Sequence, residues 1–458
     1  MNNFKIHSLL LLIAIGTTFF TVQGQQNLTL YGMSELGQAK YLNPGFEIKN
    51  KFTMSLPLGF QNFYATNNGF RMNQLFVPRA TGDSSDFKLD LAIKAMKDQN
   101  FIGLDATSEL FSLGLKVGKR NFFSFSVLNK SQVSFHYPKD IFSLAFYGNG
   151  SPQLLGKRAN LDGLGVEATS YMEYGVGFTR TINDKLTVGT RVKLLGGIAN
   201  IHTETSQLGL TTDSIDFDLT LDGKFDIRSS NTLYFTDSNT TVDPSDMIGF
   251  KNKGFGLDLG ASYKLTDKIS LSASVIDLGF ISWQANIKNY QSNAINYTFQ
   301  GVNLNDFLND SANVEEELLD TLGKIFNYQS NNTAYRTGLY TRFYVGGVYN
   351  LNKWLSASVT VYNAINQSKY TFGTAVGLNM HLKNWFSLSM NYSAIGRSAN
   401  NVGFGIRLKA GPTQFYIMSD NVLVALNPSG AKNAHLSFGM NIVINSKQSK
   451  TEAAPASK

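Results

Sequence analysis

The stretch "YKLTDKISLSASVID" (263–277) decides the fold of this chain. A short turn with Asp and Lys is followed by a run in which Ile269, Leu271, Ala273 and Val275 alternate with serines. A period of two is typical of a β-strand that is apolar on one face and polar on the other. Asp, Asn and Gly in such turns tolerate the backbone conformations that tight hairpins need. We therefore predict a β-hairpin here.

The same design recurs along the chain. It is seen in "KVGKRNFFSFSVLN" (116–129), "RTINDKLTVGTRVKL" (180–194), "NLNKWLSASVTVY" (350–362) and "HLKNWFSLSMNY" (381–392), and a sixth hairpin surrounds "AGPT" (410–413). Extending the alternation on both sides predicts fourteen strands. They cover residues 51–63, 110–118, 122–135, 171–182, 185–203, 254–265, 268–283, 335–350, 353–363, 369–382, 385–394, 401–410, 413–418 and 434–445.

The connections between these strands alternate long and short, which decides the fold class. An even strand number with two classes of connection is typical of a bacterial transmembrane β-barrel, with short turns in the periplasm and long loops outside. The alternative is a soluble β-sandwich, whose turn lengths follow no strict rule. We predict an all-β, transmembrane antiparallel barrel of about fourteen strands over residues 51–445, with helical extracellular loops and both termini in the periplasm.

The ends of the chain support export to the outer membrane. Residues 1–24 have a basic residue and a short apolar run, and we predict a signal peptide. Residues 446–458 are polar and of low complexity, and we predict a disordered periplasmic tail. Residues 25–50 precede the first strand, and a barrel of this size is too wide for wall side chains alone to fill. We therefore predict an N-terminal plug containing Asn43, Pro44, Gly45 and Phe46.

Aromatic residues beside the short turns suggest where the barrel enters lipid. Phe122, Trp354 and Trp385 each follow a basic turn, and amphipathic aromatics prefer the membrane interface. We predict that they form a membrane girdle in contact with outer-membrane lipid. The opposite faces of the strands should line a wet and partly basic lumen. Its predicted charged residues are Arg191, Lys193, Asp258, Arg342 and Arg407.

Two long connections carry helical patterns. "DFKLDLAIKAM" (86–96) places Leu89, Ala92 and Met96 on one face, and "NDFLNDSANVEEELLDTLGKIF" (305–326) has a longer apolar stripe. We predict a helix in each. A third connection, 204–253, contains an alternating run over 214–227 that predicts a hairpin above the membrane.

Several motifs resemble those of known barrels. The last strand, "SFGMNIVI" (437–444), resembles the C-terminal signal read by the barrel assembly machinery, with Ser437, Gly439, Ile442 and Ile444 at the matching positions. Asn43, Pro44 and Gly45 are similar to the Asn-Pro-Ala plug motif of the long-chain fatty-acid transporter (FadL-like) barrels, with Gly replacing Ala. That resemblance implies fourteen strands, a plug and passage of small apolar molecules.

The whole mature chain further resembles an uncharacterised barrel family of Bacteroidota. This resemblance rests on "NPGF" (43–46), "YPKDIF" (137–142), "DKLTVGTRVKLLGG" (184–197), "DKISLSASVIDLGFISW" (267–283) and "YIMSDNVLVALNP" (416–428). It implies an outer-membrane location and no reaction.

The residues that catalysis, cofactors or metals would need form no recognisable motif. There is no cysteine, and His136, His202, His381 and His435 stand in no metal-binding pair or serine-nucleophile motif. Basic residues are dispersed, which argues against nucleic acid. We predict no enzyme, no cofactor and no metal. Two functions remain: a plugged passive transporter for a small apolar or amphipathic solute, or a non-transporting barrel that scaffolds a secretion, motility or surface complex.

Overall fold

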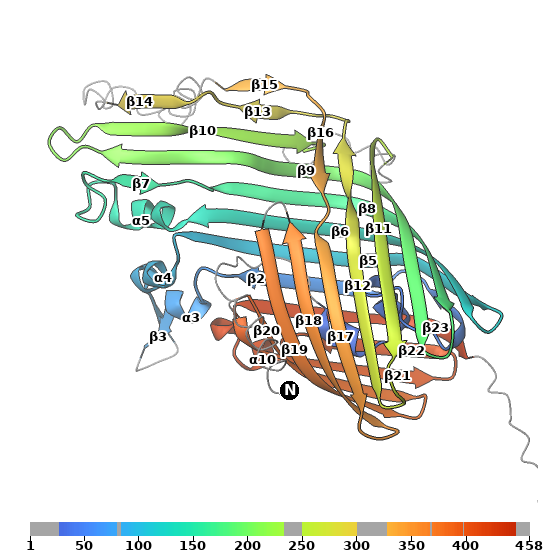
Figure 1. Cartoon of the computed structure of the whole chain (residues 1–458). Coiled ribbons are helices and arrows are strands. Elements are labelled where there is room, and N and C mark those ends of the chain that lie inside the picture. The colour runs from blue at the N-terminus through green and yellow to red at the C-terminus, as the bar shows by residue number, and fades with distance from the viewer. Residues whose placement is uncertain are drawn as a thin grey trace, which may run out of the picture.

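A computed structural model describes residues 27–79, 84–232, 250–299, 328–366, 369–396 and 398–445. The chain forms a closed antiparallel β-barrel of fourteen wall strands (Figure 1). The last strand, β23 (Asn433–Asn445), pairs antiparallel with both β1 (Asn50–Ser55) and β2 (Gln61–Asn67), which closes the sheet on itself. The predicted fold class and strand number are confirmed.

The wall strands follow one another around the barrel in chain order. They are β1 with β2, β5 (Gln99–Val117), β6 (Asn121–Pro138), β8 (Gly165–Thr181), β9 (Leu186–Thr212), β11 (Asn252–Lys264), β12 (Ile269–Trp283), β16 (Tyr335–Gly338) with β17 (Thr341–Asn350), β18 (Leu355–Asn366), β19 (Lys369–Leu382), β20 (Phe386–Ile395), β21 (Ser398–Ala410), β22 (Thr413–Ser419) and β23. Tight turns join every second pair at one end of the barrel, here called the short-turn end. The opposite end is called the long-connection end.

Alternation along the strands produces an apolar outer surface. Leu259, Leu271 and Val359 point outward and are 47%, 45% and 49% exposed, whereas Ser274 and Ser387 point inward and are buried. An outward belt of this kind would be unfavourable in water and is what a lipid-facing wall requires. None of the described helices is long and apolar enough to cross a membrane.

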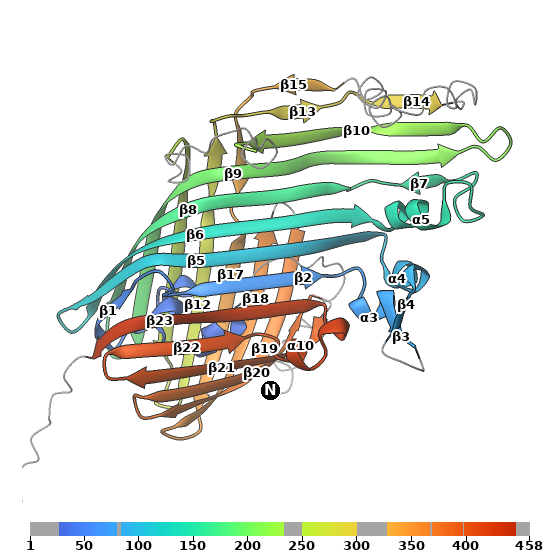
Figure 2. The same cartoon turned by 180° about the vertical axis from the view of Figure 1, so that it is seen from behind.

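One side of the barrel is much taller than the other (Figures 1 and 2). β9 has 27 residues, and β22 has only 7. The first part of β9 pairs with β11 up to Gly197, and from Asn200 onward it pairs with β10 (Leu219–Ser230) instead. β10 also pairs with β13 (Asn289–Gln291) and β14 (Ile295–Phe299), and β13 pairs with β15 (Gln329–Asn331). The hairpin predicted over 214–227 is part of this raised sheet.

Short elements gather at the long-connection end. They are α3 (Met72–Leu75), β3 (Phe76–Pro78), β4 (Ser85–Phe87), α4 (Leu89–Ala95), α5 (Lys139–Tyr147), β7 (Arg158–Asn160), α10 (Leu423–Leu426) and η3 (Pro428–Gly430). Ala92 and Met96 pack against Tyr137, so the helix predicted over 86–96 buries its apolar face. The predicted helix over 305–326, the signal peptide and the tail from 446 lie outside the described residues.

The first wall strand is interrupted between Ser55 and Gln61. Leu56 and Leu58 point outward there, and the carbonyl oxygen of Gly59 accepts a 2.5 Å hydrogen bond from the Tyr416 hydroxyl inside the barrel. Such a bulge bends the strand and redirects its side chains.

Candidate functional site

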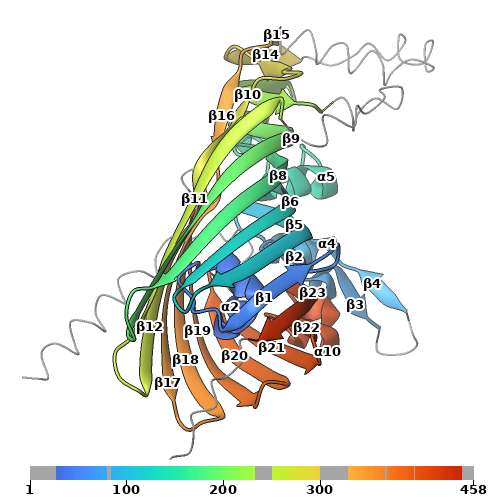
Figure 3. The ribbon, with the colours of Figure 1, turned by 90° about the vertical axis from the view of Figure 1, so that its right-hand side faces the viewer.

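The segment Asn27–Phe46 runs through the inside of the barrel, and we call it the luminal segment. It contains the short helix α2 (Leu28–Gly32) and the 3-10 helix η2 (Gly37–Tyr41). Figure 3 shows α2 between the wall strands, and most of the segment's side chains are buried. None of its residues pairs with a wall strand as part of the sheet among the described residues. The segment is therefore held by side-chain contacts.

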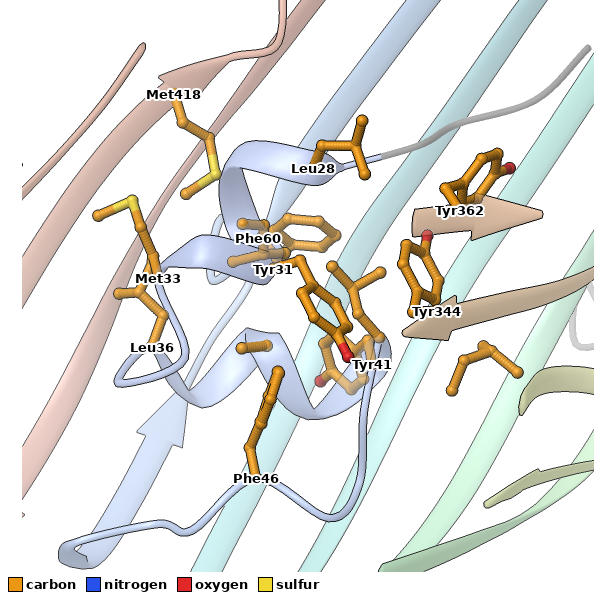
Figure 4. Close-up of a cluster of buried hydrophobic side chains, with 14 of the residues drawn as sticks. Leu28, Tyr31, Met33, Leu36, Tyr41, Phe46, Phe60, Tyr344, Tyr362 and Met418 are labelled. Carbon is orange, nitrogen blue, oxygen red and sulfur yellow. The ribbon is translucent and has the colours of Figure 1, made fainter. Parts of the chain in front are cut away.

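An apolar core joins the luminal segment to the wall (Figure 4). The Tyr31 ring stacks on Tyr344 with a centroid distance of 5.1 Å, and meets Phe46 edge-on at 5.0 Å. The Tyr31 hydroxyl is 2.9 Å from the Ser272 hydroxyl on β12. Leu30, Met33, Leu36 and Leu42 are also buried. Burial of these side chains stabilises the luminal segment inside the barrel, since each contributes roughly 1.5–3 kcal/mol of transfer free energy.

The Asn43-Pro44-Gly45 turn lies directly against the wall near the short-turn end. The Asn43 side-chain amide donates to the carbonyl oxygens of Ala261 and Ala273, both at 3.3 Å. The Thr179 hydroxyl donates to the Pro44 carbonyl at 2.7 Å. A Cβ atom on Gly45 would overlap the backbone of Ala261. Glycine is therefore needed at position 45 because the two backbones touch.

The other end of the luminal segment is fixed by Asp420, which follows β22. Its carboxylate accepts hydrogen bonds from the backbone N–H groups of Leu28 (3.2 Å) and Thr29 (2.8 Å). The Asp420 backbone N–H in turn donates to Nδ1 of His435 at 2.8 Å. Asn27, the first described residue, is buried inside the barrel at this level.

His435, Asp420 and Ser437 are close together without forming the proton arrangement of a hydrolase triad. Nδ1 of His435 accepts a hydrogen bond from a backbone N–H, so its proton lies on Nε2, which is 2.8 Å from Oδ1 of Asn62. A triad needs the opposite arrangement, with Nδ1–H donating to the Asp carboxylate and Nε2 free to accept from the serine. The group holds the luminal segment and the wall together.

Seven charged side chains meet inside the barrel above the luminal segment. This ion-pair cluster consists of Lys130, Glu173, Arg191, Lys193, Asp258, Asp277 and Arg342. Lys130 is 2.7 Å from Glu173, and Arg191 is 2.6 Å from the same carboxylate. Lys193 lies 2.5 Å from both Asp258 and Asp277, and Arg342 also binds Asp277. The cluster links six consecutive strands of the wall, from β6 to β17.

The cluster is nearly charge-balanced and dry. Four cations and three carboxylates leave a net charge of 4 − 3 = +1, and Lys193, Glu173 and Asp258 are fully buried. The lumen at this level is therefore not the wet, partly basic channel that the sequence predicted. The guanidinium of Arg191 also lies over the Tyr41 ring, 4.7 Å from its centroid, which connects the cluster to the luminal segment.

Four of the five predicted luminal charges belong to this cluster. The fifth, Arg407, lies elsewhere in the lumen, where Nε is 3.6 Å from Glu35 and Nη2 is 2.7 Å from the Ser387 hydroxyl. Sequence reasoning missed Lys130, Glu173 and Asp277. The first two stand at inward positions of their strands, so alternation could have found them.

The predicted girdle residues do not all face outward. Trp354 and Trp385 are 48% and 53% exposed beside their turns. Phe122 is buried inside the barrel, where its ring approaches Gly114, so its assignment to the girdle is wrong. Phe123 is the exposed residue at that turn. A one-residue error in register moves a side chain to the other face of a strand.

In the last strand, the four residues predicted as an assembly signal divide between the two faces. Ser437 and Gly439 point inward, and Ile442 and Ile444 point outward. A Cβ atom on Gly439 would overlap the carbonyl oxygen of Gly59 in the interrupted first strand. Gly439 is therefore needed where β23 passes that interruption.

A cavity of about 60 Å³ lies between the ion-pair cluster and the long-connection end, and we call it the upper cavity. Its lining includes Asp105, Gln132, Glu167, Tyr171, Leu339 and Tyr340. The lining thus combines carboxylates and an amide with aromatic rings and an aliphatic side chain. Such a mixture suits a small solute with one polar and one apolar part.

The sequence matches a family model over most of its length. Residues 44–420 match a family of unknown function, DUF5723. The chain belongs to that family. No match was found among curated proteins.

Solved barrel structures of low sequence identity resemble the fold. The toluene transporter TbuX of Ralstonia pickettii is 9% identical with a TM-score of 0.42, covering 90% of this chain and 94% of that one. The toluene transporter TodX of Pseudomonas putida is 12% identical with a TM-score of 0.40, covering 93% and 98%. A FadL homologue of Pseudomonas aeruginosa is 12% identical with a TM-score of 0.37, covering 89% and 93%. Because these scores are below 0.5, the fold described above rests on the strand pairings of this chain.

Proposed function

We propose that the chain is an outer-membrane barrel that acts as a plugged passive transporter for a small amphipathic solute. The observation that carries this proposal is the upper cavity, which has a mixed polar and aromatic lining. A site of that kind at the long-connection end would receive a solute from outside. The luminal segment would then have to move for the solute to pass.

The way in which the luminal segment is held supports this role. It contributes no strand to the described sheet and is fixed by side-chain hydrogen bonds, stacked rings and the Asp420 carboxylate. Contacts of this type can be broken without opening the barrel wall. The apolar belt of outward side chains supports a location in the outer membrane, because only a closed barrel leaves no unpaired strand edge in lipid.

The test is to reconstitute the full chain and compare two glycine variants. Gly45→Ala introduces a Cβ atom that overlaps the wall at Ala261, and we expect it to displace the luminal segment and raise conductance in planar bilayers. Gly37→Ala is the matched control, since no atom lies within 4 Å of the added Cβ. Deleting residues 27–45 should raise conductance further in a barrel that still assembles.

Solute entry into vesicles provides the second measurement. Vesicles containing the wild-type chain should admit a small amphipathic solute faster than protein-free vesicles and should exclude a sugar of similar size. If Gly45→Ala and the deletion both assemble and conduct no more than the wild type, the luminal segment does not close the pore. If the amphipathic solute enters no faster than in protein-free vesicles, transport is excluded.

A scaffold function is the second candidate, and exposed apolar side chains favour it. Ile215 and Phe217, at the tip of the β9–β10 hairpin, are 80% and 61% exposed, and Leu426 in α10 is 83% exposed. Apolar side chains that project from a tall extracellular wall would suit a protein partner. A stable complex that is lost in the Ile215→Ser, Phe217→Ser double variant, together with an absence of transport, would favour this function.

A further inference from the structure

The upper cavity contains one carboxylate without a counter-charge. Asp105 projects from β5, opposite Gln132 of β6 and Tyr64 of β2. Among the described residues, Asp105 has no hydrogen bond and no ion pair. Arg342, the cation that interacts with it electrostatically, is bound to Asp277. A carboxylate in this position would gain from a bound cation.

The second carboxylate of the cavity is already paired. Glu167 lies 2.5 Å from Nδ1 of His202, and Glu204 lies 3.0 Å from Nε2 of the same ring. Asp105 is therefore the part of the lining at which a ligand of positive charge would bind.

An independent feature of the cavity points to a ligand. Tyr171 is only 4% exposed, and its hydroxyl has no hydrogen-bond partner among the described residues. A tyrosine hydroxyl in a cavity wall can accept a hydrogen bond from an ammonium group. The lining also includes the aromatic residues Tyr171 and Tyr340, and an aromatic ring can attract a cation within roughly 6 Å.

We infer that the upper cavity binds the ammonium group of a small alkylamine, with Asp105 as its counter-ion and the Tyr171 hydroxyl as a second partner. This inference rests on the proposed transport function and names the substrate class. The size of the cavity agrees with it, because about 60 Å³ holds a few waters or one small head group, given that one water needs roughly 10–15 Å³. Leu339 supplies an apolar contact for the alkyl chain, which a bare inorganic cation would not use.

The test measures binding of propylammonium to the purified full-length protein by titration calorimetry, with propan-1-ol and propionate as neutral and anionic probes of similar size. We expect propylammonium to bind most tightly and propionate not to bind. Asp105→Asn should weaken propylammonium binding at least about tenfold, the effect of losing one charge-assisted hydrogen bond, and should leave propan-1-ol unchanged. Asp98→Asn, at an exposed position just before the same strand, is the matched control and should change nothing.

The outcomes separate this inference from the proposed function. If propan-1-ol enters vesicles that contain the protein faster than protein-free vesicles, and propylammonium binds no more tightly than propan-1-ol, transport stands and the ammonium assignment is wrong. Equal propylammonium affinity in the wild type and a folded Asp105→Asn variant also overturns the assignment. Binding of sodium or potassium that competes fully with propylammonium would show an inorganic cation site instead. Asp105-dependent binding without vesicle entry would support the site and overturn transport.

Discussion

Single glycines decide how closely the luminal segment approaches the wall. Asn43, Pro44 and Gly45, which the sequence predicts to lie in a plug, form a turn in which the Gly45 N–H donates to the Asn43 side chain at 2.8 Å. The reason that position 45 must be glycine is different, because its backbone touches Ala261 across the barrel. Added Cβ atoms at Gly189 and Gly260 would likewise overlap Pro44 or Asn43. Because Ala261 is far from Gly45 in the chain, the residues around position 45 do not reveal that contact.

Buried charges are the second residue-scale feature, and they carry a prediction about stability. Lys193→Met removes a cation that lies 2.5 Å from both Asp258 and Asp277. We expect the free energy of unfolding to fall by about 3–5 kcal/mol, because the buried Asp258 carboxylate loses its closest cation and keeps, among the described residues, only Arg191 at 3.5 Å. Urea unfolding of the detergent-solubilised barrel measures this. Lys185→Met, in an exposed short turn, should change the value little.

A double variant checks the cause of that loss. Combining Lys193→Met with Asp258→Asn removes one charge of each sign, so part of the lost stability should return. If the two losses simply add, the ion pair is not what stabilises this part of the lumen.

Asp277 shows why the cluster could be predicted only in part. Its backbone is in the left-handed region with φ of 60°, and the pairing of β11 with β12 shifts register between Leu257 and Leu259. This bulge turns the Asp277 carboxylate into the lumen, although the neighbouring Ile276 is also buried. An alternation pattern assumes an unbroken pleat, so it cannot assign the side of a residue within a bulge.

At the scale of elements, tight hairpins were predicted more accurately than strand ends. The predicted strand over 369–382 coincides with β19 (Lys369–Leu382), whereas β5 begins at Gln99 and not at 110. The pairing of β5 with β6 shifts register between Glu109 and Phe111. That bulge reverses the phase of the alternation, and the three inward side chains nearest to it, Asp105, Thr107 and Glu109, are polar or charged. The sequence pattern therefore predicts a loop, and not a strand, for the first half of β5.

The raised part of β8 and β9 should respond to pH. His202 lies beyond Gly197, where β9 stops pairing with β11, and so belongs to the raised sheet that β9 forms with β10. Burial alone would lower the pKa of His202, but its hydrogen bonds to the carboxylates of Glu167 and Glu204 outweigh burial and raise that pKa above the ordinary value. The guanidinium of Arg228 on β10 is a further charge near His202, since it lies 3.8 Å from the Glu204 carboxylate.

The sign of the pH effect follows from that shift. A histidine with a raised pKa in the folded state contributes stability that is fully present below its unfolded pKa of about 6.5 and is lost as pH rises through the folded value. Hydrogen-exchange protection factors should therefore fall as pH is raised from 6 to 8.5, both for β9 beyond Gly197 and for the part of β8 that pairs with it, up to Ser170. In His202→Gln this dependence should largely disappear, and persistence of the full effect would place its origin elsewhere.

At the scale of the whole molecule, closure of the barrel decides which inward side chains contact one another, and local sequence patterns do not predict these contacts. Lys130 of β6 reaches Asp277 of β12, which is not its neighbour in the sheet, and Arg342 reaches the same carboxylate from the adjacent strand β17. The N-terminal segment fills the space below them. Periodicity predicts which residues point inward, but the pairing of inward residues depends on barrel diameter and strand stagger, which no single strand specifies.

The outward belt allows the position of the membrane to be tested. Leu259→Arg places a charge among outward leucines of the wall, where the side chain is 47% exposed in the isolated chain. If this belt lies in lipid, the substitution should lower the free energy of unfolding from lipid vesicles by about 2–4 kcal/mol, because hydrocarbon cannot solvate the guanidinium. Ile215→Arg, on an 80% exposed side chain at the tip of the raised hairpin, should lower it by much less. Equal losses at the two positions would mean that the belt at Leu259 and the hairpin tip share one environment, and the barrel would then not be embedded as its surface indicates.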